Sequence, residues 1–295
     1  MYDIERYYQA KDVADAVRAL QADPESIVIS GGSDVLIKIR EGKLAGCSLV
    51  SVHGLEELKG IDRKEDGTIC IGAASTFSFI ANSRLVQEYI PMLGEAVDQA
   101  GGPQLRNIGT VGGNVCNGVT SADSASSLCC MNAWLVLAGP EGMRRVPISQ
   151  WYTGPGRTVR GHEEVLVRIE IEKQDYQGFS GHYIKYGKRN AMEIATLGCA
   201  AYVKLSEDKK TMEELRLAYG VAAPTPIRCP QAEALARGER PGDAIAAAAA
   251  QAALKEVSPR SSWRASKEFR LQLVDELCRR ALKEAVIRGG GQWNA

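Results

Sequence analysis

The sequence predicts an α+β protein made of more than one domain. Over 13–171, short apolar runs typical of strands alternate with amphipathic helical segments, and a polar stretch over 173–181 follows. Beyond this stretch the pattern changes to antiparallel strands and then to Ala-rich helices. Two glycine pairs, Gly31–Gly32 and Gly112–Gly113, interrupt the first part. We therefore expect two distinct folding regions, of which the first carries two glycine loops.

Periodicity and chain breakers justify each element of the first region. Asp23-Pro24 ends an amphipathic helix, Ser75-Thr76 is an N-cap signal, and strict alternation marks the last strand. The expected strands are short apolar runs: 27–29, 48–52, 68–73, 134–138 and 165–171. The expected helices are 13–20, two between 76 and 100 that separate near Pro91, and 123–131.

The second region is expected to form a sheet covered by helices. Its predicted strands are 182–188, 200–205 and 215–219, and its predicted helices are 243–256 and a closing helix. In the closing helix Phe269, Leu273, Leu277 and Ala281 recur at a spacing of four, which indicates a packed face. The glycines at 289–291 predict a frayed tail over 289–295.

The composition is that of an ordinary soluble globular protein. Apolar residues make up 45% and charged residues 24% of the 295 positions, enough for two or three subdomains. Thirty-six basic residues balance 36 acidic ones, which gives no electrostatic support to a nucleic-acid or membrane-surface role. No run approaches the roughly 20 apolar residues of a membrane span, and the N-terminus lacks an apolar signal segment. We expect a cytoplasmic protein.

The eight cysteines and three histidines do not form a metal-binding pattern. No C-x-x-C occurs, and the adjacent Cys129 and Cys130 cannot easily place both thiolates on one tetrahedral ion. His162 begins a segment similar to a zinc helix, but no second histidine follows at the required spacing. Cys116, beside the second glycine pair, is interpreted as apolar filler. The sequence predicts reduced thiols and no intrinsic metal site.

The two glycine pairs predict a site for a diphosphate. Only glycine adopts φ > 0 cheaply, and successive exposed N–H groups in such turns form concave anion sites. Hydroxyl residues flank both pairs, and a carboxylate or carboxamide follows each, in 29–34 and 109–114. The Walker lysine motif and the Rossmann G-x-G-x-x-G are absent, and Gly154–Gly156 is interpreted as a turn. A diphosphate cofactor gripped between two separate loops is therefore expected.

Four segments resemble, in order, the landmarks of the FAD-binding subunits of the molybdenum hydroxylases. They are 30–36, 71–76, 110–114 with 121–123, and 185–195. Three more segments are similar to the xanthine dehydrogenase branch: 118–125, 220–228 and 265–270. The resemblance covers nearly the whole chain. It implies a two-part FAD-binding domain of the vanillyl-alcohol-oxidase (PCMH) type over 1–176, with subdomains 1–54 and 55–176. A C-terminal α+β domain of the CO-dehydrogenase-flavoprotein type is then expected over 177–288.

The resemblance also implies which residues hold FAD. The first loop wraps the pyrophosphate with backbone amides and the second closes on it, while Asp123 lies along the ribityl or ribose side. Leu166 is expected near the adenine and Lys185 beside the flavin ring. Ile71 stands where some relatives carry an aromatic over the ring, which leaves the ring open to nicotinamide. The implied cofactor-binding residues are Ile27, Val28, Ile29, Ser30, Gly31, Gly32, Ser33, Asp34, Ile71, Thr110, Val111, Gly112, Gly113, Asn114, Asp123, Leu166 and Lys185.

Structural roles compete with some of these assignments. Asp34 and Asp123 each precede a predicted helix, so either carboxylate is also a candidate N-cap. Lys185 alternates with its strand neighbours and is also readable as a solvated strand residue. Tyr186 and Arg189 are further candidates for the pocket.

The family resemblance implies an oxidoreductase subunit with non-covalent FAD. Electrons would come from a molybdopterin subunit through two [2Fe–2S] clusters of an iron–sulfur subunit, and NAD⁺ would accept hydride. A purine such as xanthine is the expected substrate of a dimer of heterotrimers. The alternatives are another family branch (CO, nicotinate or aldehyde dehydrogenase), a stand-alone flavoprotein oxidase and a non-enzymatic nucleotide-binding scaffold. No histidine occurs between Gly54 and Gly161, which supports a non-covalent flavin.

Overall fold

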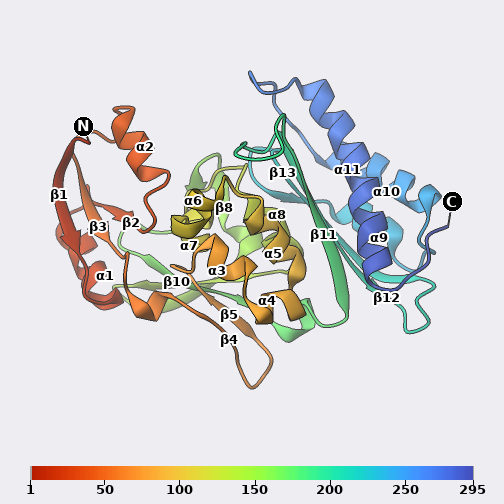
Figure 1. Ribbon diagram of the computed structural model, residues 1–295, viewed down its shortest axis with the longest axis horizontal. Helices are drawn as coiled ribbons and strands as arrows, with labels where there is room; N and C mark the ends of the chain where they lie inside the picture. Colours follow the sequence, from red (N-terminus) through yellow and green to blue (C-terminus); the bar gives the residue numbers. More distant parts are fainter. Residues whose placement is uncertain (1, 295) are drawn as a thin grey trace.

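Three larger β-sheets, each with its own helices, follow one another along the molecule (Figure 1). The computed structural model describes residues 2–294. The N-terminal lobe is a parallel sheet with the order β1-β3-β2. Its elements are β1 (Ile4–Gln9), α1 (Val13–Ala22), β2 (Ile27–Ile29), α2 (Val35–Arg40) and β3 (Cys47–Ser51). Asp12 caps α1, and Val13, Ala16, Val17 and Leu20 bury one face of this helix.

The middle lobe is a five-stranded antiparallel sheet with the order β4-β5-β10-β6-β7. Its strands are β4 (Ile61–Arg63), β5 (Ile69–Gly72), β6 (Trp134–Gly139), β7 (Gly142–Pro147) and β10 (Val165–Ile171), beside the hairpin β8 (Tyr152–Gly154) and β9 (Arg157–Thr158). Its helices are α3 (Phe77–Ala81), α4 (Arg84–Tyr89), α5 (Pro91–Asp98), α6 (Pro103–Ile108), α7 (Val111–Cys116) and α8 (Asp123–Cys130), with 3₁₀ turns η1 (Glu56–Leu58), η2 (Ile148–Gln150) and η3 (Lys173–Asp175).

The C-terminal lobe is an antiparallel sheet with the order β11-β12-β13-β14 and three helices. Its elements are β11 (Phe179–Tyr186), β12 (Leu197–Leu205), β13 (Met212–Gly220), β14 (Ile227–Arg228), α9 (Pro230–Ala236), α10 (Asp243–Glu256) and α11 (Lys267–Arg288). Alternate residues of β12 enter two different cores: Cys199 and Val203 face α10 and α11, whereas Ala200 and Tyr202 join the core of the middle lobe. The sheet is therefore covered on both faces.

Two arginines of the C-terminal lobe hold the carboxyl end of α8. Arg216 on β13 donates to the carbonyl of Cys130 at 3.1 Å and forms an ion pair of 2.8 Å with Asp175. Arg228 on β14 donates to the carbonyl of Cys129 at 3.0 Å. Both contacts satisfy carbonyl groups that the end of a helix leaves without a partner. The middle and C-terminal lobes are joined through α8.

The structure corrects three expectations about elements. Residues 76–100 form three helices, because a break at 82–83 precedes the one at Pro91. Phe269 is 37% exposed, whereas Leu273 and Leu277 of the same helix are buried. The tail is not frayed at 289–294, because the amide of Asp243 donates to the carbonyl of Asn294. The other strands and helices expected in the first region are present within one or two residues at their ends.

Candidate functional site

The first glycine loop presents backbone amides with no acceptor in the protein. It connects β2 to α2, and Gly32 has φ +72°, in the left-handed region that glycine favours. Within residues 2–294, the amides of residues 31–34 donate no hydrogen bond. A Cβ added to Gly31 would overlap the carbonyl oxygen of Ile108. The loop is thus a set of free N–H donors seated directly against the backbone that precedes the second glycine pair.

The second glycine segment differs from the expectation, because its amides are bonded within the protein. It forms the first turn of α7, and the hydroxyl of its N-cap Thr110 accepts from the amide of Gly113 at 3.1 Å. The amides of Val111 and Gly112 donate to the carbonyls of Ser75 and Ala73. None of its glycines has a positive φ. Gly112 is needed for close packing, since an added Cβ would lie 2.6 Å from the Cβ and the carbonyl oxygen of Ala73.

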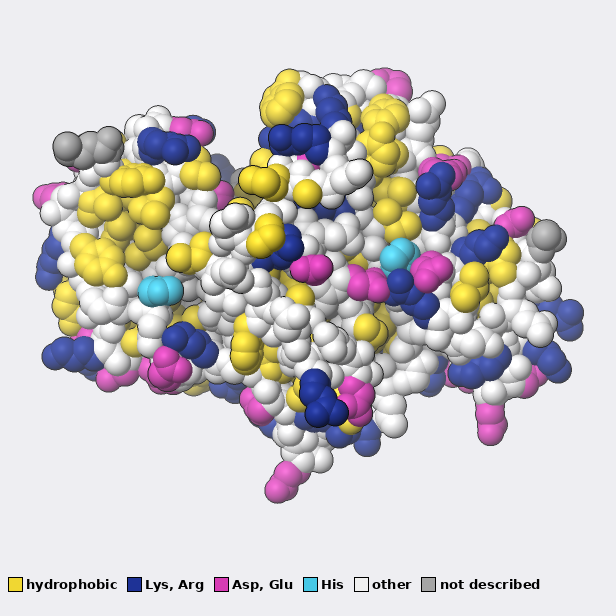
Figure 2. Space-filling view, in the orientation of Figure 1, with side chains coloured by type: hydrophobic (Ala, Val, Ile, Leu, Met, Phe, Trp, Pro, Cys, Tyr) yellow, Lys and Arg dark blue, Asp and Glu magenta, His cyan; other side chains and the backbone are white. Residues whose placement is uncertain are grey.

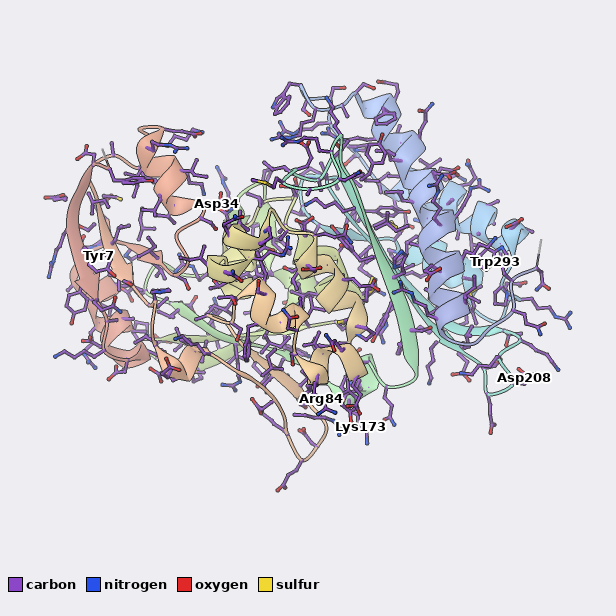
Figure 3. The ribbon with its side chains drawn as sticks, in the orientation of Figure 1. Tyr7, Asp34, Arg84, Lys173, Asp208 and Trp293 are labelled. Carbon is purple, nitrogen blue, oxygen red and sulfur yellow. The ribbon has the colours of Figure 1, made fainter. Side chains whose placement is uncertain are left out.

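Polar side chains tie the two segments together. The hydroxyl of Thr110 lies 3.4 Å from that of Ser30. The carboxylate of Asp34 accepts from the side-chain amide of Asn117 at 2.5 Å, and Lys38 donates to the other end of the same amide at 2.7 Å. Figure 3 shows Asp34 in the gap between α2 and the middle lobe. Sequence reasoning missed Lys38 and Asn117, because their 79-residue separation leaves no local pattern.

A second group of predicted residues forms a buried ion pair between the middle and C-terminal lobes. Asp123 starts α8, and its carboxylate accepts from Lys185 on β11 at 2.9 Å and from the hydroxyl of Tyr183 at 3.0 Å. Lys185 also donates to the carbonyl of Gln99 at 2.8 Å. The side chains of Asp123 and Lys185 are only 10% and 8% exposed. The solvated-strand interpretation of Lys185 is therefore wrong.

Burial shifts the pKa values of the Asp123 carboxyl and of the Tyr183 hydroxyl. Burial raises the pKa of the Asp123 carboxyl, and the Lys185 ammonium and the Tyr183 hydroxyl oppose that rise. Burial and the neighbouring carboxylate raise the pKa of Tyr183 well above its usual value. Asn114 on α7 accepts from the hydroxyl of Ser124 at 2.7 Å, which connects the second glycine segment to this group.

Neither aspartate acts as an N-cap. Asp34 occupies the N-cap position of α2 but makes no side-chain capping bond, and its carboxylate bonds to Asn117 instead. The N-cap of α8 is Ala122, so Asp123 lies inside the first turn of the helix. Both capping interpretations are therefore wrong, and both carboxylates are directed to partners distant in sequence.

The side chains of the apolar candidates are largely buried in the protein cores. The side chain of Ile71 is fully buried in the core of the middle lobe, so a contact of this residue with a flavin would involve its backbone. Leu166 is 5% exposed in the same core. The side chains of Ile27, Val28 and Ile29 contact apolar residues on the two faces of their sheet.

The remaining candidates have ordinary structural surroundings. Cys116 packs against the middle core, and burial raises the pKa of its thiol to about 11, as expected for unreactive filler. Tyr186 packs edge-on against Phe269 at 5.6 Å, and Arg189 is paired with Glu193. In the described part of the chain, no three His, Cys, Asp or Glu side chains are grouped as metal ligands. None of its helices has both the length and the apolar character needed to cross a bilayer.

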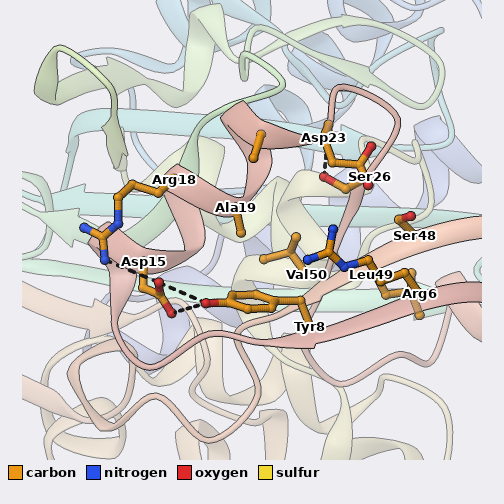
Figure 4. Close-up of a pocket in the computed structure, with 11 residues that line it drawn as sticks. Arg6, Tyr8, Asp15, Arg18, Ala19, Asp23, Ser26, Ser48, Leu49 and Val50 are labelled. Carbon is orange, nitrogen blue, oxygen red and sulfur yellow. Dashed lines mark hydrogen bonds and ion pairs between the residues drawn. The ribbon is translucent and has the colours of Figure 1, made fainter.

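A cavity of about 250 Å³ lies in the N-terminal lobe, between α1 and the sheet (Figure 4). Tyr8 and Arg18 contact the carboxylate of Asp15 in it, at 3.0 and 3.3 Å. Arg6 and Ser48 line the same cavity. It contains none of the predicted site residues and is distinct from the glycine loop and the Asp123–Lys185 pair described above.

The first glycine loop suits a ligand with a diphosphate. The free amides of 31–34 are donors for phosphate oxygens, and the close contact at Gly31 leaves no room for a side chain at that position. The side chain of Asn114 bonds to Ser124, the residue after Asp123, so the second glycine segment is connected to the Asp123–Lys185 pair. In Figure 2 the surface is indented between the N-terminal lobe and the C-terminal lobe.

Comparisons with known proteins agree along the whole chain. Residues 2–173 match the family described as the FAD binding domain in molybdopterin dehydrogenase, and residues 182–285 match the CO dehydrogenase flavoprotein C-terminal domain. The chain is 42% identical over 292 residues to the xanthine dehydrogenase FAD-binding subunit of Escherichia coli O157:H7, covering 99% of both chains. It is 30% identical to the carbon monoxide dehydrogenase medium chain of Hydrogenophaga pseudoflava, covering 96% of this chain and 97% of that one.

A solved structure of carbon monoxide dehydrogenase from Hydrogenophaga pseudoflava matches with a TM-score of 0.92 and 28% identity, over 98% of this chain and 99% of that chain. A solved quinoline 2-oxidoreductase from Pseudomonas putida 86 has the same fold, with a TM-score of 0.89. The overall fold is thus shared with these proteins.

Proposed function

Because this chain belongs to the FAD-binding subunits of the molybdenum hydroxylases, we propose that it serves a xanthine- or purine-oxidising complex that reduces NAD⁺. The observation that supports a flavin site most directly is the row of free amides at 31–34, seated against the backbone at Ile108. The purine assignment is supported by the 42% identity over the whole chain with a xanthine dehydrogenase subunit.

In this proposal, each group of the chain has a separate task. The amides of 31–34 bind the diphosphate, and the paired Thr110 and Ser30 hydroxyls hold the two lobes around it. Lys185 supplies positive charge beside the ring, and Asp123 and Gln99 fix the position of its ammonium. Bound FAD would supply the hydride and electron chemistry that links [2Fe–2S] clusters of a partner subunit to NAD⁺.

The cofactor is tested first. The purified chain should be yellow and should release FAD rather than FMN, because the free amides of residues 31–34 suit a diphosphate rather than a single phosphate. Acid precipitation should leave a colourless pellet if the flavin is not covalently bound. Mass analysis of the supernatant identifies the cofactor. Release of FMN, or failure to bind any flavin on reconstitution, would rule out the proposed site.

The division of labour is tested with the same preparation. Alone, the chain should transfer electrons from NADH to an acceptor dye and should not oxidise xanthine or hypoxanthine. Addition of its iron–sulfur and molybdopterin subunits should produce purine-dependent NAD⁺ reduction. Purine turnover by the isolated chain would favour a stand-alone oxidase. Turnover of CO or nicotinate by the complete complex would assign the chain to another branch of the family.

A further inference from the structure

The surface next to Lys185 exposes large apolar side chains. Trp263 is 78% exposed, Met192 66% and Ile194 51%, and Phe269 is partly exposed beside them. Trp263 lies in the loop 257–266, Met192 and Ile194 lie in the loop 187–196, and Phe269 lies in the first turn of α11. The two loops meet at the amino end of α11 (Figure 1). Arg270 joins these loops, because its buried guanidinium donates to the carbonyl of Thr196 at 3.2 Å and to the hydroxyl of Ser262 at 2.9 Å. The term rim patch is used for these apolar residues together with four neighbouring cations, Lys188, Arg260, Arg264 and Lys267.

The cations of the rim patch have no acidic partner. Lys188, Arg260, Arg264 and Lys267 form no ion pair with any residue in 2–294. Arg264 stacks over Trp263 at 4.2 Å and Lys188 lies 5.9 Å from the same ring. The Nε atom of Arg264 is buried without a hydrogen-bond partner. The chain as a whole has no net charge, so this concentration of positive charge is local.

Met192 is held outward by a strained turn. Its φ is +54°, in a region that side chains other than glycine rarely adopt. Arg189 donates to its carbonyl at 2.7 Å, and its own amide donates to the carbonyl of Gly101 at 3.3 Å. The loop is therefore fixed to the middle lobe, yet its largest apolar side chain faces solvent.

We propose that the rim patch is the docking surface for the electron-delivering partner subunit, which presents acidic side chains around an apolar centre. The four exposed apolar side chains form a larger surface than a small anion could cover. Trp, Met and Arg are also enriched in protein interfaces. The unpaired cations match an acidic surface. The rim patch lies close to Lys185 in the chain, because the ring of the next residue, Tyr186, contacts Phe269 of the patch. This inference rests on the proposed function, which places the flavin ring beside Lys185.

The test measures binding of the full-length chain to its purified iron–sulfur and molybdopterin subunits. One double variant, Trp263→Ser/Met192→Ser, removes apolar contacts, and a second, Lys188→Glu/Arg264→Glu, reverses charge. We expect each to weaken association by about tenfold or more, with FAD content and far-UV circular dichroism unchanged. Added salt should weaken binding of the wild type more than that of the charge-reversed variant.

Matched controls lie on other surfaces. Met143→Ser changes a residue of β7 that is 56% exposed, and Arg84→Glu changes an exposed cation at the opposite edge of the molecule (Figure 3). Both should bind like the wild type. Wild-type affinity in both double variants would overturn the docking surface even if the chain carries FAD. Absence of FAD from the wild type would instead overturn the proposed function, whatever the association measurements give.

Discussion

Gly31 is a residue at which the backbones of the N-terminal and middle lobes touch. A methyl group there would overlap the carbonyl oxygen of Ile108, and backbone cannot move away as a flexible side chain can. We expect Gly31→Ala to lower the free energy of unfolding by about 1–3 kcal/mol. It should also lower FAD occupancy, because the amide-bearing loop would be displaced. Urea unfolding of the FAD-free protein and flavin absorbance measure the two effects.

Gly154→Ala is the matched control for this substitution. The nearest atom to an added Cβ at Gly154 is the Cδ of Arg157 at 4.0 Å, and Gly154 does not have a positive φ. Its stability should change by no more than about 0.5 kcal/mol. Equal stability of the two variants would show that the loop and Ile108 are not in close contact.

The ion pair with Lys185 offsets the free-energy cost of burying the Asp123 carboxylate. Lys185→Met would leave that carboxylate without its counter-ion, which should cost about 3–5 kcal/mol near neutral pH. Burial already raises the Asp123 pKa, and the substitution should raise it further. A raised pKa in the folded state means that protonation favours folding. The loss of stability should therefore be largest at a pH above the pKa of Asp123 in the folded protein. It should shrink as the pH falls towards the pKa of Asp123 in the unfolded chain.

Urea unfolding of Lys185→Met at about pH 8 and about pH 5 measures this dependence. The double variant Lys185→Met/Asp123→Asn carries no titrating carboxyl at the site, so its stability relative to the wild type should vary less with pH. NADH–dye activity should also fall in Lys185→Met if the ammonium lies beside the flavin ring. If both variants lost the same free energy of unfolding at both pH values, the loss would come from packing rather than from the charge of Asp123.

At the scale of elements, α8 depends on Arg216 at its carboxyl end. Arg216 and Asp175 are 6% and 7% exposed, so Arg216→Met would leave a buried carboxylate whose remaining side-chain donor is Asn132. We expect a loss of about 3–5 kcal/mol in the free energy of unfolding. Arg216→Met/Asp175→Asn should recover part of it. Arg280→Met, which breaks an exposed pair with Glu276, should cost no more than about 1 kcal/mol. Similar losses for Arg216→Met and Arg280→Met would contradict a buried role.

The elements that sequence analysis found best are those whose local pattern matches their burial. The strand over 165–171 and the helix over 243–256 have the predicted bounds. The first strand, β1, was missed because four of its six residues are exposed and give no alternating signal. α2, α6 and α7 were missed because each has only six residues, too few to show a helical period.

Across the whole molecule, the order of the two domain types was predictable because it follows the order of the motifs. The contacts between lobes were not. Asp123 and Lys185 are 62 positions apart and meet only because β11 packs against the middle lobe. The second glycine segment was expected to have free amides, but the carbonyls of Ala73 and Ser75, which follow β5, accept from it, and no local pattern reveals this. The complete burial of the Ile71 side chain was unpredictable for the same reason, because it depends on the order of the strands in the sheet.

The position of α8 makes the boundary near residue 176 a poor place to cut. Its amino end is held by Lys185 and Tyr183 and its carboxyl end by Arg216 and Arg228, all of which lie beyond that boundary. A helix that belongs to the first domain is thus held in its orientation by residues of the second domain at both of its ends. Exchange of C-terminal domains among relatives would have to preserve the contacts at both ends of α8. A domain that kept only one set would tilt α8 and move Asp123 away from Lys185.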